Sequence, residues 1–299
     1  MKNNKYRGTG VALVTPFRKD GSIDFKSLSQ LTEYVIEKGV DYLVVNGTTG
    51  ESATISKDEK SAIVASVVEV NNKRKPVVVG FGGNSTSEVV NAIKGFDFDG
   101  VDAILSVCPY YNKPSQKGIY QHFKAVANAS SVPVFLYNVP GRTVVNIEPE
   151  TTLQLAKDFD NIIGIKEATD NIDQVMKLIA AKPKEFLVVG GDDALGLPLL
   201  ACGVDGVISV ISNAYPEEYS AMIKAGLKND IAKARTIHYQ LIPVMETLLT
   251  MNNPGGIKAV LSIMGLIENY LRLPLVPVSK THFGKLQEMM GSVKLQEKV

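Results

Sequence analysis

A lysine ends an apolar segment of the chain: residues 161–165, Asn-Ile-Ile-Gly-Ile, are followed directly by Lys166. Burying an amine costs several kcal/mol, so a lysine at the end of a buried strand is seldom there for packing alone. Burial disfavours the ammonium form and leaves a free amine that can attack a carbonyl carbon. The alternative is a lysine that forms a salt bridge with Glu167 or Asp170. Lys166 is therefore a candidate nucleophile, to be tested against the rest of the chain.

Three further segments carry side chains that suit a small-acid substrate. The turn at residues 47–50 combines backbone N–H groups with the hydroxyls of Thr48 and Thr49, which suits a carboxylate, unless it is a plain strand-to-helix turn. Tyr137 ends an apolar run, and its phenol can carry a proton to or from a carbinolamine oxygen, although a core tyrosine is the alternative. Arg142 follows a Pro-Gly pair, where its guanidinium can hold a second carboxylate or form a surface salt bridge.

These residues follow short apolar runs rich in β-branched side chains, and each gap between runs leaves room for one helix. The runs lack polar alternation, as do strands that are buried on both faces. Eight βα units with short turns predict an α/β fold, a (β/α)8 barrel, with an open doubly wound sheet as the alternative. In such a barrel the chemistry gathers at the C-terminal ends of the strands. The predicted strands are 10–14, 42–45, 77–80, 103–107, 132–137, 162–166, 187–190 and 206–210.

Helical patterns fill the gaps between the strands and then dominate the end of the chain. After about residue 228 no strand pattern recurs. We therefore predict a barrel catalytic domain of residues 1–228 and a C-terminal helical domain of residues 229–299 that packs on the barrel. The predicted helices include 25–37, 57–71, 87–95, 119–128, 149–157 and 172–179 between the strands, and 230–251, 256–271 and 280–290 in the tail.

Other polar residues are assigned no catalytic role. Strand alternation sends Glu167 to the side opposite Lys166, so Glu167 is left out of the candidate catalytic group. The histidines His122, His238 and His282 have no metal-ligand spacing, so no metal site is predicted. The glycine-rich segment 80–85 has serine where a dinucleotide fingerprint has its third glycine. These residues therefore predict neither a metal site nor a dinucleotide site.

The composition favours a small-molecule partner. The chain has 299 residues and a formal net charge of +1, which gives no bias towards nucleic acid or anionic membranes. No apolar run approaches the roughly 20 residues of a membrane span. Residues 1–6 are polar, without the apolar core of a signal sequence. We expect a cytoplasmic protein with neither a nucleic-acid nor a membrane partner.

Three motifs in order resemble a known family, the pyruvate-dependent Schiff-base aldolases typified by dihydrodipicolinate synthase and N-acetylneuraminate lyase. The resemblance covers the whole chain, and the three motifs together are highly specific. Within the family, Pro109-Tyr110-Tyr111 and Arg142 are similar to the synthase branch, because the sialic-acid lyases lack that arginine. The motifs are Gly47-Thr48-Thr49-Gly50-Glu51, Tyr137-Asn138-Val139-Pro140-Gly141-Arg142-Thr143 and Gly164-Ile165-Lys166-Glu167-Ala168.

The resemblance implies roles for the residues that match the family's motifs. Lys166 would form an imine with pyruvate, whose carboxylate would rest on Thr48 and Thr49. Thr48, Tyr111 and Tyr137 would form a proton relay, with Tyr111 reaching into a neighbouring subunit's site. The imine would acidify the pyruvate methyl group, and the resulting enamine would attack an aldehyde. The resemblance thus implies a Schiff-base lyase that needs no cofactor.

The remaining implied roles concern the second substrate and the assembly. Arg142 would bind the carboxylate of aspartate-4-semialdehyde, while Gly190 and Ile208 would line the pyruvate pocket through backbone groups. The implied activity is the condensation of pyruvate with this aldehyde in lysine and diaminopimelate biosynthesis. The resemblance also implies a homotetramer built from tight dimers.

The family often carries an allosteric lysine site at a dimer interface. Lysine-sensitive members tend to have histidines where this chain has Lys57 and Lys60. Two ammonium groups would repel a cationic effector, so we expect little inhibition by lysine. The positions that match the allosteric site are Ser52, Ala53, Lys57, Lys60, Asn84, Glu88 and Tyr110.

Two other functions remain open from the sequence. A sibling aldolase or dehydratase would use the same imine on a sugar acid. Arg142 separates the two, because an aldehyde with its own carboxylate needs the guanidinium, whereas a polyhydroxylated aldehyde needs hydroxyl partners. A non-catalytic binding or regulatory protein could also keep the barrel, since fold alone does not determine function.

Overall fold

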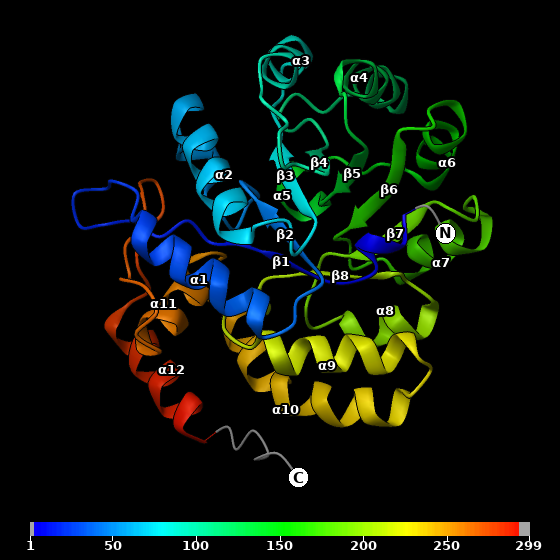
Figure 1. Cartoon of the computed structure of the whole chain (residues 1–299). Helices are drawn as coiled ribbons and strands as arrows, with labels where there is room; N and C mark the ends of the chain where they lie inside the picture. Colours follow the sequence, from blue (N-terminus) through cyan, green and yellow to red (C-terminus); the bar gives the residue numbers. More distant parts are fainter. Residues whose placement is uncertain (1–2, 293–299) are drawn as a thin grey trace.

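Eight parallel strands close into a barrel in a computed structural model, which describes residues 3–292 (Figure 1). Each strand pairs with its neighbours in sequence, and β1 pairs with β8 to close the ring. This confirms the predicted (β/α)8 barrel and excludes the open sheet. The strands are β1 (Gly8–Ala12), β2 (Tyr42–Val45), β3 (Val77–Phe81), β4 (Ala103–Val107), β5 (Val134–Asn138), β6 (Ile162–Glu167), β7 (Leu187–Gly190) and β8 (Gly206–Ser209).

Helices surround the barrel and begin at polar caps. In α2, the Ser56 side chain accepts from Glu59 N–H, and the Glu59 carboxylate accepts from Ser56 N–H. This capping box satisfies two otherwise free donors of the first turn. The helices are α1 (Phe25–Glu37), α2 (Lys57–Asn71), α3 (Thr86–Lys94), α4 (Gln116–Ala129), α5 (Pro140–Thr143), α6 (Pro149–Asp158), α7 (Ile172–Ala181), α8 (Gly196–Cys202), α9 (Pro216–Leu227), α10 (Ile231–Leu249), α11 (Gly255–Ile263) and α12 (Lys280–Ser292), with short 3-10 turns η1 (Asn4–Tyr6), η2 (Ser52–Thr54) and η3 (Ile211–Asn213).

The structure differs from the predicted elements at β1, at α4, which begins three residues before the predicted start, and in the tail. Strand β1 begins two residues before the predicted start and ends at Ala12, because Val14 N–H donates to the Asn213 side chain and not to the next strand. The helix predicted over 256–271 ends at Ile263, and Gly265 follows with a φ of 74° that few other residues adopt. No bounds are predicted for three helices, α5, α8 and α9, of which α8 and α9 follow β7 and β8 as the βα alternation predicts.

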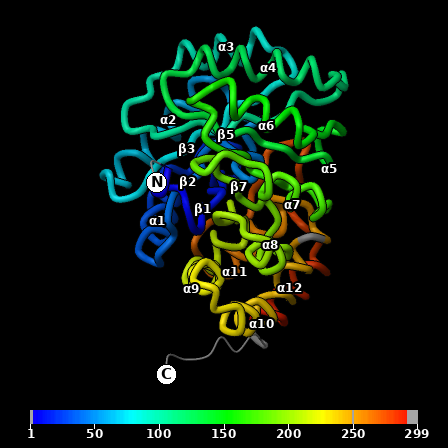
Figure 2. The backbone as a smooth tube through the Cα atoms, turned by 90° about the vertical axis from the view of Figure 1, so that its right-hand side faces the viewer, coloured from blue at the N-terminus to red at the C-terminus, as the bar shows by residue number. Residues whose placement is uncertain are grey.

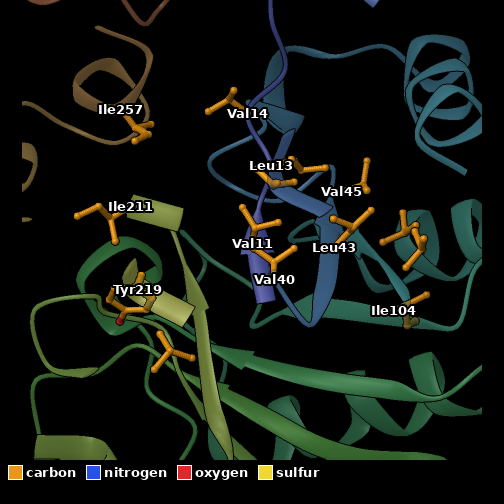
Figure 3. Packing of buried hydrophobic residues seen from close by; sticks show 14 of the residues in the cluster. Val11, Leu13, Val14, Val40, Leu43, Val45, Ile104, Ile211, Tyr219 and Ile257 are labelled. Atoms are coloured by element: carbon orange, nitrogen blue, oxygen red, sulfur yellow. The ribbon is translucent and has the colours of Figure 1, made fainter. Parts of the chain in front are cut away.

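Strand alternation separates two hydrophobic layers. On β2, Tyr42 and Val44 belong to the cluster inside the barrel, whereas Leu43 and Val45 belong to the layer between barrel and helices. Figure 3 shows this outer layer, with Ile257 of α11 facing the barrel. The outer layer therefore continues into the C-terminal segment, which shares the main core of the protein.

The C-terminal helices lie along one side of the barrel, where α10 packs mainly against α9 (Figures 1 and 2). Helix α12 contacts α10 and α11. The division into domains at residue 228 stays a prediction, and residues 1–2 and 293–299 of the two predicted domains lie outside the described residues. Within the described chain, no helix is long and apolar enough to cross a membrane.

Candidate active site

Lys166 and Tyr137 lie side by side at the C-terminal end of the barrel. They are paired residues on the adjacent strands β6 and β5, and Lys166 Nζ lies 4.4 Å from the centroid of the Tyr137 ring. Only 6% of Lys166 and 7% of Tyr137 is exposed. Within residues 3–292 the Lys166 amine forms no ion pair, so the alternative of a salt bridge to Glu167 or Asp170 is wrong. A buried amine without a counter-ion is available for covalent chemistry.

The Lys166 side chain occupies space that is left by Gly191, the residue directly after β7. A Cβ at Gly191 would lie 2.8 Å from Lys166 Cε and 2.5 Å from Ala168 Cβ. Real Cβ atoms do not approach other carbons this closely, so any side chain at position 191 must displace the lysine or the strand. Gly191 thus leaves the space that the Lys166 side chain occupies, and no pattern in the sequence indicated this contact.

Gly191→Ala should displace the Lys166 amine. We expect the rate of imine formation to fall on the order of 10²-fold, the usual effect of misplacing a reacting group by about 1 Å. The matched control is Gly284→Ala in α12, where a Cβ would meet nothing within 4 Å. Stopped-flow or quenched trapping with a ketoacid and borohydride would measure the rate. Equal rates for Gly191→Ala and Gly284→Ala would show that a side chain at position 191 does not affect imine formation by Lys166.

Glu167 points away from the amine, as strand alternation predicts, into a polar network behind the barrel wall. Asn138 Nδ2 donates to Glu167 Oε1 at 2.7 Å, and Gln174 Nε2 donates to Oε2 at 3.1 Å. Asn146 links the two amides at 2.8 Å on each side. Because Asn138 and Glu167 each follow a candidate catalytic residue, the network fixes the ends of β5 and β6 relative to each other.

Burial raises the pKa of Glu167 to about 7, although the hydrogen bonds from Gln174 and Asn138 oppose the rise. The folded protein therefore binds this proton more tightly than the unfolded chain, in which the pKa is 4.5. Below pH 4.5 both states are protonated and the group has no effect. As the pH rises from 4.5 to about 7, the unfolded chain ionises first and folding loses stability.

Glu167→Gln should remove this pH dependence. The free energy of unfolding of the variant minus that of the wild type should increase by about 3 kcal/mol between pH 4.5 and 8. Any effect of the substitution that does not depend on pH shifts this difference equally at every pH and leaves the increase unchanged. Urea denaturation at a fixed protein concentration across this range would measure the difference. A difference that stays flat with pH would contradict the raised pKa.

The turn after β2 has the features of an anion site. Gly50 N–H donates to Gly47 O at 3.1 Å, and the Thr15 hydroxyl donates to Gly50 O at 2.7 Å, so the turn is held from within and by the segment that follows β1. The backbone N–H groups of Thr48 and Thr49 have no acceptor among residues 3–292. Two adjacent free N–H groups can bind a carboxylate.

Residues of the distant C-terminal segment contact this turn. Asn253 Nδ2 donates to Thr49 Oγ1 at 2.9 Å, and Lys258 Nζ lies 2.5 Å from Glu51 Oε1. Arg272 N–H donates to Glu51 Oε2 at 3.1 Å. No local pattern in the sequence indicated these contacts, because more than 200 residues separate each pair.

Arg142 lies on α5, the single helical turn that follows β5. Its side chain is exposed and forms no ion pair with any residue of the described chain, so the alternative of a surface salt bridge is wrong. An unpaired guanidinium near the C-terminal end of β5 is free to bind a carboxylate.

Comparison with known proteins then identifies the family. The Dihydrodipicolinate synthetase family matches residues 5–292. The chain belongs to this family. It is 55% identical, over 91% of this chain and 93% of the relative, to the 4-hydroxy-tetrahydrodipicolinate synthase of Flavobacterium psychrophilum. It is 49% identical to the synthase of that name from Parabacteroides distasonis, over 99% and 100% of the two chains. The resemblance inferred from the three motifs is confirmed.

A solved structure shares the fold. The chloride-inhibited dihydrodipicolinate synthase of Acinetobacter baumannii, complexed with pyruvate, has a TM-score of 0.93 and 39% sequence identity, and the match covers 97% of this chain and 99% of that one. This likeness agrees with the barrel and C-terminal helices of this member of the Dihydrodipicolinate synthetase family. The high identity to enzymes also argues against the non-catalytic alternative.

Of the other positions matched to the Dihydrodipicolinate synthetase family, Gly190 and Ile208 lie in the barrel wall and Tyr111 lies at the surface. Ile208 belongs to the cluster inside the barrel together with Tyr137. A Cβ at Gly190 would meet Leu199 and Val207 in the outer layer, so only the backbone of Gly190 can face the site. Tyr111 is 86% exposed and has a φ of 76°, an uncommon and strained value for a bulky residue.

The positions matched to the allosteric site lie at the surface around α2 and α3. The exposed ones are Ala53, Lys57, Asn84, Glu88 and Tyr110, and the half-buried ones are Ser52 and Lys60. Burial lowers the pKa of Lys60. Within residues 3–292 no group of three or more His, Cys, Asp or Glu side chains is arranged to hold a metal ion.

Proposed function

We propose that the protein condenses pyruvate with L-aspartate-4-semialdehyde through a Schiff base on Lys166, giving 4-hydroxy-tetrahydrodipicolinate. The observation that carries this proposal is the buried Lys166 amine beside Tyr137, without a counter-ion in the described chain. The name shared by the relatives supports the product. The activity belongs to lysine and diaminopimelate biosynthesis.

In the first half of the proposed reaction, pyruvate becomes a nucleophile. The Lys166 Nζ lone pair attacks the ketone carbon, and the resulting carbinolamine loses water to give a protonated imine. We assign the protonation of the leaving oxygen to Tyr137, and the contact of the Lys166 amine with its ring supports this assignment. The free N–H groups of Thr48 and Thr49 bind the pyruvate carboxylate. The imine then withdraws electrons, so the methyl group loses a proton and an enamine forms.

In the second half, the enamine carbon attacks the aldehyde carbon, and the new alkoxide takes a proton. The amino group of the former semialdehyde next attacks the imine carbon, which closes the ring and releases Lys166 as the free amine. Arg142 holds the carboxylate of the semialdehyde throughout, through two charge-assisted hydrogen bonds. The residues proposed to line the pyruvate pocket through backbone groups are Gly190 and Ile208.

The proposed proton relay runs through Thr48, Tyr137 and Tyr111. The exposure of Tyr111 and its strained backbone support a role outside its own subunit, in which Tyr111 of the partner subunit completes the relay. We therefore propose a homo-oligomer, a tetramer built from two tight dimers. The surface around α2 and α3 that matches the family's allosteric site carries Lys57 and Lys60. Their ammonium groups would repel a lysine effector, so we propose that lysine inhibits the enzyme only weakly.

The experiment is borohydride reduction of the wild-type protein with pyruvate, followed by intact mass and peptide mapping. We expect one reduced pyruvyl group per chain, carried on Lys166. A panel of aldehydes is then scored by the rate at which each consumes the trapped species. A protein that prefers polyhydroxylated aldehydes to the semialdehyde would be the sibling sugar-acid enzyme, and absence of any adduct would refute the Schiff-base mechanism.

A further inference from the structure

The C-terminal segment contacts the carboxylate-binding turn at two adjacent points. Asn253, just before α11, donates to the Thr49 hydroxyl oxygen, and two residues further along the turn Glu51 is held by Lys258 and Arg272. Figure 3 shows α11 beside the outer layer, where Ile257 faces Val14 and Ile211. The segment that closes the chain thus also bounds the turn that we propose to bind pyruvate.

The direction of the Asn253 hydrogen bond decides what the Thr49 hydroxyl can do. Asn253 Nδ2 is the donor and Thr49 Oγ1 the acceptor, at 2.9 Å. A hydroxyl has one proton to donate, and this bond does not use it. Among residues 3–292 the Thr49 hydroxyl donates no hydrogen bond. Thr49 is therefore left with an unused O–H donor beside two unused backbone N–H donors.

The ionic contacts hold the segment at a defined position. Lys258 is 0% exposed, and its amine bonds both Glu51 and the Tyr270 carbonyl oxygen, the latter at 2.9 Å. Arg272 is held by Glu59 at 2.5 Å. Both cations also lie over the Phe17 ring, at 4.2 and 4.6 Å from its centroid. A buried ion pair whose members all have partners stabilises one arrangement and disfavours its alternatives.

We propose that Asn253 is a positioning residue for pyruvate, which orients the Thr49 hydroxyl so that its proton points at the substrate carboxylate. The contacts among Lys258, Glu51 and Arg272 hold the loop between α10 and α11, which carries Asn253, against the turn after β2. The inference rests on the proposed function, since it assigns the pyruvate carboxylate to this turn. It assigns a role in substrate affinity to a residue that belongs to the C-terminal segment and not to the barrel.

The decisive variant is Asn253→Asp, which keeps the shape of the side chain and reverses the hydrogen bond. The Thr49 hydroxyl would then donate to the aspartate, and the new negative charge would repel the pyruvate carboxylate. Asn253→Ala removes the bond without adding charge. Thr49→Val removes the hydroxyl and keeps the shape. The matched control for the added charge is Asn229→Asp, on the exposed loop between α9 and α10.

The readout is the half-saturating pyruvate concentration in borohydride trapping, together with steady-state kinetics on both substrates. We expect KM for pyruvate to rise about tenfold in Asn253→Ala and in Thr49→Val, and about a hundredfold in Asn253→Asp. The double variant Thr49→Val/Asn253→Ala should be no worse than Thr49→Val alone, because both changes remove one interaction. KM for the aldehyde and the extent of trapping at saturating pyruvate should stay at the wild-type values.

Each outcome separates this inference from the function on which it rests. A wild type that forms no pyruvyl adduct would overturn the proposed function and the inference together. A wild type that forms the adduct, with Asn253→Asp at the wild-type half-saturation, would overturn the inference alone. A purely structural role would lower the thermal midpoint and the extent of trapping while leaving KM for pyruvate unchanged, and that result also overturns it.

Discussion

Lys166→Ala should abolish the activity while leaving the barrel folded. We expect kcat/KM to fall on the order of 10⁴-fold or more, because the covalent route through the imine is lost entirely and not merely slowed. Trapping with pyruvate and borohydride should give no adduct. Removal of a buried amine that has no ion-pair partner leaves no counter-charge stranded, so the thermal midpoint should change little.

A second buried lysine provides the internal control. Lys258 is more deeply buried than Lys166, but its amine is paired with Glu51 and hydrogen-bonded to a carbonyl oxygen. Burial lowers the pKa of Lys258 to about 8, against the opposing effect of Glu51, so near pH 7 it remains mainly an ammonium. Peptide mapping should therefore find the pyruvyl group on Lys166 and none on Lys258. A labelled Lys258, or an adduct in Lys166→Ala, would contradict the assignment.

The contrast between the two lysines shows how much of the site local sequence can reveal. The sequence predicts that Lys166 and Tyr137 lie near each other, because each ends an apolar run, and such a run in a parallel barrel places its last residue at the C-terminal end of the strands. Strand alternation also predicts correctly that Glu167 faces away from the amine. These are short-range patterns, and the barrel itself follows from repeating them eight times.

The contacts of the C-terminal segment could not be found in this way. Asn253 meets Thr49 across 204 positions of sequence, and no period or spacing links the two. Lys258 lies within an apolar helix, where a single charge gives no indication of its partner until Glu51 is brought beside it. The room that Gly191 leaves for Lys166 likewise depends on how the segment after β7 packs against β6. Local patterns predict the elements and the strand-end residues, while the identity of long-range partners depends on how the elements pack.

Arg142→Ala should separate the two halves of the reaction. We expect kcat/KM for the semialdehyde to fall on the order of 10²- to 10³-fold, because a charge-assisted bidentate contact is lost. The half-saturating pyruvate concentration in borohydride trapping should stay at the wild-type value, since the carboxylate of pyruvate is assigned to the turn after β2. Arg142→Lys should recover part of the loss, because it keeps the charge but lacks the guanidinium fork.

The specificity of the effect distinguishes substrate binding from a general defect. An uncharged aldehyde of the same length gains nothing from a guanidinium, so its kcat/KM should be equal in the wild type and in Arg142→Ala. The matched control is Arg235→Ala on the exposed side of α10, which should change neither aldehyde. If the charged and uncharged aldehydes lose activity equally in Arg142→Ala, the guanidinium does not bind the substrate carboxylate, and the sugar-acid alternative gains support. Arg142 has no ion-pair partner within the described chain, so its removal leaves no carboxylate of the protein without a counter-ion. A loss confined to the charged aldehyde can then only reflect contact with the substrate.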